Sequence, residues 1–214
     1  MLIAFSGVDG AGKTTQIELL VEHLISKGIK SKVIWSRGGY TPLFNWMKNV
    51  AGVSKSSSKD EDQYQSLRNR SLNNRSIRTL WLFIAMVDLF FLYALEFRWH
   101  LFRGKWVIAD RYLLDTEIDF DLNFAQEKFD KWLLWKITKW LSPKPNKHFL
   151  LLIPVEESQR RSRLKNEPFP NSYQILSYRL EIYQRSCLTS RLFSCLNCQD
   201  PIEEIHRRII NSIV

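Results

Sequence analysis

The stretch Gly7–Thr14 constrains this 214-residue chain more than any other part of its sequence. It reads Gly-Val-Asp-Gly-Ala-Gly-Lys-Thr and fits the pattern G-x-x-x-x-G-K-[ST], whose glycines let backbone N–H groups turn inward around phosphate oxygens. In this pattern the lysine reaches the β- and γ-phosphates of ATP, and the final hydroxyl binds Mg²⁺. The predicted cofactor-binding residues are Gly7, Gly10, Ala11, Gly12, Lys13, Thr14 and Thr15.

The residues on both sides of this loop have the periodicity that such a loop needs. Leu2–Phe5 is an apolar run typical of a short buried strand, and a helix is expected from about Lys13 to Lys27. The apolar residues of that helix share one face: Ile17, Leu20, Val21, Leu24 and Ile25. The N-terminus of the helix would point at the bound anion, where its dipole favours negative charge. The strand–loop–helix order therefore supports nucleotide binding.

The order of elements along the rest of the chain predicts an α/β fold. Further strands are expected at Lys32–Trp35, Trp106–Ala109, Phe149–Ile153 and Leu192–Leu196. Helices are expected at about Arg75–Phe102 and Asn123–Leu141, from Pro154, at Tyr173–Thr189, and from Ile202 to Ile213. Because strands and helices alternate, the sheet should be parallel. We expect one P-loop NTPase domain, residues 1–214, with three α/β/α layers around about five strands and a lid-like basic segment near 157–172.

The net positive charge of the chain favours anionic partners but does not show which kind it binds. Lysine and arginine number 31 against 22 acidic residues, for a net charge of +9, which favours nucleotides, nucleic acid or an acidic membrane face. No DNA-binding or RNA-binding motif is found, so nucleic acid is not expected as a partner. Trp132, Trp135 and Trp140 interleave with lysines, which fits either a helix packed on the domain or peripheral membrane contact. The packed helix is the preferred interpretation.

Other features predict a cytoplasmic protein. Three cysteines are too few for a secreted disulfide framework, and the Cys195-x-x-Cys198 pair lacks the further ligands of a zinc site. The apolar start is interrupted within a few residues and has no basic region before it, unlike a signal peptide. The apolar run Leu80–Leu95 carries Asp88 and is shorter than the roughly 20 residues of a bilayer span, so it should be a buried helix or part of a subunit interface.

Asp110 and Arg111 follow the apolar run Trp106–Ala109 directly. A carboxylate at the end of such a strand supports the magnesium shell in P-loop proteins, so Asp110 and Thr14 are the predicted metal residues. Arg111 is a candidate phosphate clamp, because a guanidinium group binds phosphate through two parallel hydrogen bonds. An ordinary surface aspartate at a strand end would have the same local sequence.

Two clusters of arginines are candidate phosphate ligands. Arg160, Arg161 and Arg163 follow the fourth expected strand, and a basic segment there can neutralise the phosphoryl group in transit. A solvated helix face is the alternative, and the lack of arginine inside the loop favours the catalytic interpretation. For the second cluster, solvation and acceptor binding remain equally open: Arg68, Arg70, Arg75 and Arg78.

The chain resembles the thymidylate kinase family of nucleoside monophosphate kinases. The resemblance rests on Phe5–Gln16, on the triplet Asp110-Arg111-Tyr112, on the basic segment after Pro154–Glu157, and on the tail Asp200–His206. It spans most of the chain and is thin between Tyr40 and Lys105. It implies a homodimer and transfer of the ATP γ-phosphoryl group to the 5′-phosphate of dTMP, with ATP and Mg²⁺ as cofactors.

The resemblance also implies roles for single residues. Asp9 would lie near the acceptor sugar and magnesium, Arg37 near the acceptor phosphate, and Phe83 would stack on the base. Arg111 would bridge donor and acceptor phosphates. The catalytic set is then Lys13, Asp9, Arg111 and the lid arginines Arg160, Arg161 and Arg163, while Asp9, Arg37, Phe83 and Arg111 bind substrate.

Departures from the family pattern leave the acceptor open. Val87 stands where an arginine usually reads the base, and loss of those donors costs about 1–3 kcal/mol. The acidic stretch Asp115–Asp119 replaces small polar residues, which is unfavourable beside an anion, and no glycine follows Gly104 in the lid region. A kinase of the same fold acting on another nucleotide, a phosphorylated sugar or a lipid is the first alternative, and a non-catalytic nucleotide-dependent binding protein is the second.

Overall fold

Five parallel strands form one sheet in the order β2-β3-β1-β4-β5 in the computed structural model, which describes residues 1–36, 75–165 and 171–213. The strands are β1 (Leu2–Gly7), β2 (Ser31–Trp35), β3 (Trp106–Asp110), β4 (Lys147–Leu152) and β5 (Phe193–Asn197). The predicted parallel sheet of about five strands is confirmed. β1 lies at its centre and is buried along its whole length.

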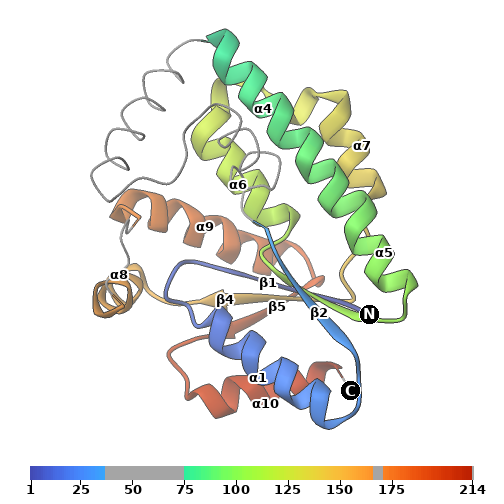
Figure 1. The fold of residues 1–214 in the computed structure, drawn as a ribbon. Helices are drawn as coiled ribbons and strands as arrows, with labels where there is room; N and C mark the ends of the chain where they lie inside the picture. Colours follow the sequence, from blue (N-terminus) through green and yellow to red (C-terminus); the bar gives the residue numbers. More distant parts are fainter. Residues whose placement is uncertain (37–74, 166–170, 214) are drawn as a thin grey trace, which may run out of the picture.

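Helices cover both faces of this sheet (Figure 1). On one face α1 (Lys13–Ser26) lies beside α10 (Ile202–Ile213), which buries Ile205 and Ile209. The other face carries α4 (Arg75–Phe90), α5 (Phe97–Phe102), α6 (Leu113–Phe124), α7 (Leu133–Leu141) and α9 (Tyr173–Thr189). The remaining helix, α8 (Val155–Leu164), follows β4. The three-layer arrangement agrees with the fold class expected from the sequence.

The long apolar helix is part of the domain core. A π-helical segment, Phe91–Glu96, joins α4 to α5 without a break, so the helix runs from Arg75 to Phe102. Residues 78–102 are long and apolar enough to cross a membrane, but 39% of the most apolar window is buried. One face of the helix packs into a core cluster with the sheet: Leu82, Met86, Leu89, Tyr93 and Phe97. One face of the predicted helix is thus buried in the core, whereas Leu80, Phe91 and Leu95 on its other side are exposed.

The helix predicted at Asn123–Leu141 is wrong. The structure instead has α6 from Leu113 to Phe124, two 3₁₀ turns, and then α7. Lys128 adopts a left-handed conformation with φ of 47°, and Trp132 is extended at the start of α7. Both conformations are incompatible with a continuous α-helix. Trp135 is fully buried on α7, whereas Trp140 is 80% exposed.

A disulfide joins Cys187 on α9 to Cys195 on β5, with 6.1 Å between their Cα atoms. This disulfide was not anticipated from the sequence, where Cys195 was considered only together with Cys198. Cys198 is a buried free thiol, and burial raises its pKa to about 12. Among the described residues, no group of three or more His, Cys, Asp or Glu side chains could hold a metal ion.

Candidate active site

The loop predicted to bind phosphate lies between β1 and α1, at the carboxyl edge of the sheet. A Cβ added to Gly7 would lie 2.5 Å from the carbonyl oxygen of Leu151 on β4, so only glycine fits there. Gly10 has φ of 75°, and its Cβ would lie 3.1 Å from Cβ of Arg161. Gly12 begins α1 without a side-chain cap, which leaves the first backbone N–H groups of the helix for an anion.

Lys13 is buried within this loop. Its ammonium group donates to the carbonyl oxygens of Gly7 and Val8, both at 2.9 Å. Burial lowers the pKa of Lys13 to about 8, and Arg111 adds to this effect, while Asp9 and Asp110 oppose it. The neighbouring side chain of Thr14 is exposed, and that of Thr15 is half-buried. The loop therefore holds one cation inside and presents one hydroxyl outside.

Asp110 ends β3, directly beside β1, where it is in register with Phe5. Its Oδ1 atom is buried and has no hydrogen-bond partner, and burial raises the pKa of the carboxyl group although Lys13 and Arg111 oppose the shift. A buried carboxylate oxygen without a donor is what a magnesium shell would use, together with a loop hydroxyl and substrate phosphates. The residues present therefore fit Mg²⁺, with Asp110 and Thr14 as its candidate ligands.

Arg111 is held in a strained backbone conformation next to Asp110. Its φ is 71°, a left-handed value that is uncommon for any residue except glycine. Its N–H donates to the carbonyl of Phe5 at 2.8 Å, and its own carbonyl accepts from the hydroxyl of Ser36 at 2.9 Å. These two contacts, one to β1 and one to the residue that follows β2, hold the backbone of Arg111 in place.

Two carboxylates hold the guanidinium group of Arg111. Nη2 donates to Oδ1 of Asp9 at 2.5 Å, and Nη1 lies 3.4 Å from Oδ1 of Asp115. Burial alone would lower the pKa of Arg111, but Asp115 and Asp9 raise it, so the group stays charged. The predicted residues Asp9 and Arg111 are thus brought into direct contact.

Asp9 connects the loop to two residues that the sequence analysis did not single out. Its Oδ2 accepts from Nδ2 of Asn171 at 2.6 Å, and its main-chain carbonyl accepts from the hydroxyl of Ser158 at 2.6 Å. Both partners are separated from Asp9 by about 150 residues or more in the sequence, so no local pattern could identify them. Their positions, one on α8 and one just before α9, bring the region after β4 onto the loop.

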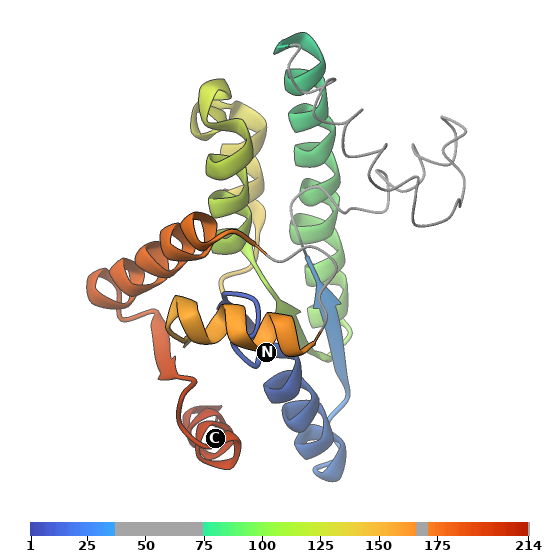
Figure 2. The same cartoon turned by 90° about the vertical axis from the view of Figure 1, so that its left-hand side faces the viewer.

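The three predicted lid arginines all lie on α8, the orange helix in Figure 2, but they have different surroundings. Arg161 lies against the loop and donates to the carbonyls of Gly10 at 3.3 Å and Cys198 at 3.1 Å. Arg160 is exposed and forms two hydrogen bonds to Glu157, while Arg163 is also exposed. Hydrogen bonds from Arg160 and Arg161 lower the pKa of Glu157 to about 2. Only Arg161 therefore contacts the loop in this conformation.

The structure describes only some of the residues that were predicted to bind the phosphate acceptor. Phe83 is 48% exposed on α4, and Val87, one turn later, is half-buried. Arg37 lies outside the described residues, as do Arg68 and Arg70 of the second arginine cluster. In the described part of that cluster, Arg78 pairs with Glu127 at 2.5 Å, which is a structural contact.

The acidic stretch after Arg111 does not add unpaired charge to the site. Asp115 faces Arg111, Asp119 is paired with Arg179 on α9, and Glu117 is paired with Lys139 at 2.9 Å. Asp115 and Asp119 are both buried. The repulsion that the sequence suggested for an anionic acceptor is therefore offset by cations on neighbouring helices.

Comparison with known proteins agrees with this geometry. The family model for thymidylate kinase matches residues 5–209. A probable thymidylate kinase of Archaeoglobus fulgidus is 26% identical over 223 aligned positions, which cover 100% of this chain and 96% of that protein. The thymidylate kinase of Orientia tsutsugamushi is 26% identical, covering 99% of this chain and 91% of its own length. The chain belongs to the thymidylate kinase family, whose activity is the conversion of dTMP to dTDP with ATP.

Proposed function

We propose that this chain performs the family reaction at the carboxyl edge of β1 and β3, with Lys13 and Arg111 as its central cations. The observation that carries the proposal is the Arg111–Asp9 contact, which places a buried guanidinium group over the phosphate-binding loop. An oxygen of the dTMP phosphate would bond to the γ-phosphorus as the bond to the β-phosphate oxygen breaks, which releases ADP. The acceptor phosphate is a weak base that is already ionised, so the step needs no strong general base.

Each residue then has a defined role. Lys13 neutralises the β- and γ-phosphates, and Arg111 exchanges Asp9 for phosphate oxygens between donor and acceptor. Thr14 and Asp110 would hold Mg²⁺, which would neutralise charge on the phosphates. The basic segment 157–172 acts as a lid on this single domain, where Arg160, Arg161 and Arg163 cover the transferred group. Asp9, Arg37 and Phe83 position the acceptor sugar, phosphate and base.

Coupled ADP release against a panel of acceptors tests the reaction. With Mg·ATP, dTMP should stimulate ADP release far more than dUMP, the other nucleoside monophosphates or buffer alone. Lys13→Ala should lose orders of magnitude in kcat, and omission of Mg²⁺ should abolish turnover. Wild-type turnover by Lys13→Ala would contradict the site. Stimulation by a different phosphorylated acceptor would retain the phosphate chemistry and reassign the base pocket around Val87.

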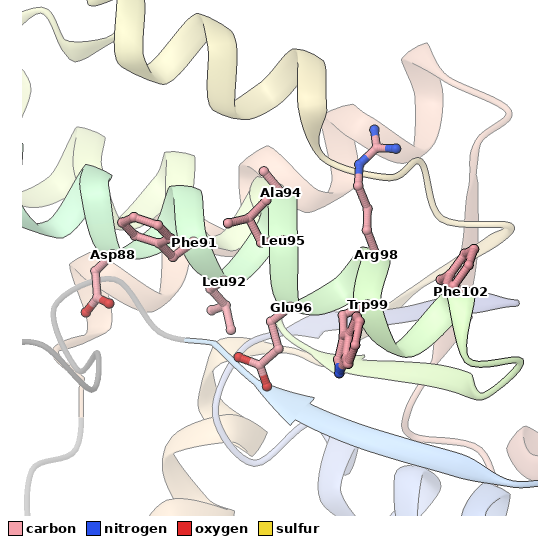
Figure 3. A pocket seen from close by; sticks show the side chains of 9 residues that line it. All are labelled: Asp88, Phe91, Leu92, Ala94, Leu95, Glu96, Arg98, Trp99 and Phe102. Atoms are coloured by element: carbon pink, nitrogen blue, oxygen red, sulfur yellow. The ribbon is translucent and has the colours of Figure 1, made fainter.

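A homodimer is the assembly that the surface favours. An apolar groove of about 820 Å³ runs along the helix from Asp88 to Phe102 (Figure 3). Its exposed apolar side chains are Phe91, Leu95, Trp99 and Phe102, which are 51–88% accessible, and the exposed charged residues Glu96 and Arg98 also line it. A second copy of the chain would cover this face. Light scattering should give a dimer mass that falls to the monomer mass in Leu95→Glu, and a monomeric parent would contradict this assignment. We place the enzyme in the cytoplasm, where dTMP and ATP are found.

A further inference from the structure

The carboxylate of Asp115 is the centre of a buried polar cluster beneath Arg111. Asp115 is fully buried. Its Oδ2 accepts from the hydroxyl of Ser6 and from the backbone N–H of Tyr112 at 3.1 Å. Its Oδ1 accepts from the hydroxyl of Tyr183 at 2.8 Å and faces Nη1 of Arg111 at 3.4 Å. Four donors, from β1, α9 and the loop between β3 and α6, therefore converge on one carboxylate.

A second layer fixes the direction of these hydrogen bonds. The hydroxyl of Ser6 lies 2.8 Å from Nε2 of His148 on β4, and Ser6 has only one proton to give. Because that proton goes to Asp115, the Nε2 atom of His148 must carry the hydrogen that is donated to Ser6. Burial lowers the pKa of His148 to about 4, which keeps the ring neutral. Hydrogen bonds thus run from His148 to Ser6 and from Ser6 to Asp115, and Asp115 can act only as an acceptor.

The two carboxylates that hold Arg111 differ in accessibility. The side chain of Asp9 is 22% exposed and sits on the phosphate-binding loop, whereas that of Asp115 is 1% exposed and sits on α6. Incoming phosphate can therefore replace Asp9 at the guanidinium group but cannot reach Asp115. Asp115 is the partner that stays.

We propose that Asp115 is a positioning residue that holds Arg111 in the orientation needed for phosphoryl transfer. This inference rests on the role of Arg111 in the proposed function. A guanidinium group with a left-handed backbone and one exchangeable partner would otherwise reorient when Asp9 is displaced. The Asp115 carboxylate, itself fixed by Ser6, Tyr112 and Tyr183, removes that freedom before the substrates bind. Displacement of a catalytic group by about 1 Å costs on the order of 100-fold in rate.

A double-mutant cycle between Asp115 and Arg111 tests the inference. Asp115→Asn keeps the size and removes the charge, and kcat should fall at least about tenfold while KM for ATP changes less than about threefold. In an Arg111→Ala background the same change should lower kcat by less than about twofold, because the group it positions is gone. Asp119→Asn is the matched control, one turn later on α6 and paired with Arg179 instead. Its effect should be the same in both backgrounds.

The outcomes separate this inference from the proposed function. If Asp115→Asn lowers kcat by the same factor with and without Arg111, Asp115 is only a structural residue and the inference fails. If Arg111→Ala turns over like the parent, the role of Arg111 in the proposed function fails first. If Asp115→Asn does not fold, Tyr183→Phe and Ser6→Ala are the alternative variants. Each removes one of the hydroxyl groups that donate a hydrogen bond to the Asp115 carboxylate. Both should lower kcat only when Arg111 is present, and unchanged kcat in both would overturn the inference.

Discussion

The hydroxyl of Ser158 on α8 donates to the main-chain carbonyl of Asp9 at 2.6 Å, which fastens the basic helix to the phosphate-binding loop. The same contact brings the carbonyl of Ser158 to 3.2 Å from where a Cβ on Gly10 would lie. The loop and α8 are therefore packed too closely for a side chain at position 10.

We expect Gly10→Ala to lower kcat/KM for ATP by at least tenfold. Its φ of 75° strains any L-residue, and its Cβ would crowd Arg161 at 3.1 Å, which moves α8 away from the loop. Gly104→Ala is the matched control, since Gly104 has φ of 73° and nothing within 4 Å of an added Cβ. Both variants should lose about 1 kcal/mol of stability from the backbone strain, but only Gly10→Ala should lose activity. Equal kinetics in the two variants would rule out crowding as the cause.

Arg161 and Arg160 should differ in steady-state kinetics although they are neighbours on α8. Arg161→Ala removes hydrogen bonds to the carbonyls of Gly10 and Cys198, so KM for ATP should rise several-fold. Arg160→Ala removes only an exposed pair with Glu157, so KM for ATP should stay within about twofold. If the truncation of Arg160, Arg161 and Arg163 together leaves kcat unchanged, the lid assignment is wrong.

The Asp119–Arg179 pair should have a large effect on stability when only one partner is removed. Asp119→Ala leaves a buried guanidinium group whose Nε and Nη1 atoms already have no partner, and should cost about 3–5 kcal/mol. The double variant Asp119→Leu, Arg179→Met should recover most of that loss. Urea unfolding measures both changes, and Glu181→Ala is the control, because its pair with Arg185 on α9 is exposed and should contribute less than about 1 kcal/mol. A small effect of Asp119→Ala would show that water reaches this pair.

His148 should make stability fall in mildly acidic solution. Burial lowers the pKa of His148 to about 4 in the folded state, with Asp115 opposing the shift, whereas the unfolded value is about 6.5. Between these values the unfolded chain binds one more proton, so this contribution is complete above pH 6.5 and is lost as the pH falls through 4. The total is roughly 3 kcal/mol.

Chemical unfolding of the parent and of His148→Gln between pH 7 and pH 4.5 measures this contribution. Glutamine cannot titrate but can still donate to Ser6. The free energy of unfolding of the variant should therefore fall less steeply with decreasing pH, by the slope that corresponds to the uptake of about one proton. Parallel curves for the two proteins would show that another group causes the slope.

Local patterns predicted the loop, the strands and the Asp110-Arg111 pair, because each of these depends on residues next to one another in the chain. The helix expected at Asn123–Leu141 failed because hydrophobic spacing contains no information on a left-handed residue such as Lys128. The partners of Asp9 could not be predicted, since Ser158 and Asn171 meet it only after the sheet has formed.

The acidic stretch Asp115–Asp119 also shows that partners distant in the sequence cannot be predicted from local patterns. Asp119 was interpreted as an obstacle to an anionic acceptor, but its partner Arg179 lies 60 residues later on another helix. Charge along a sequence can be summed, whereas its compensation in three dimensions depends on packing that a single sequence does not reveal.

The strand order β2-β3-β1-β4-β5 has a consequence for how such an enzyme can diversify. The loop, Asp110 and Arg111 are attached to β1 and β3, two of the three strands that have neighbours on both sides, where a substitution disturbs the whole sheet. Phe83 and Val87 are on a helix outside the sheet, where side chains can be exchanged with little effect on the interior. Selection can therefore retune which molecule receives the phosphate while the transfer chemistry is inherited unchanged.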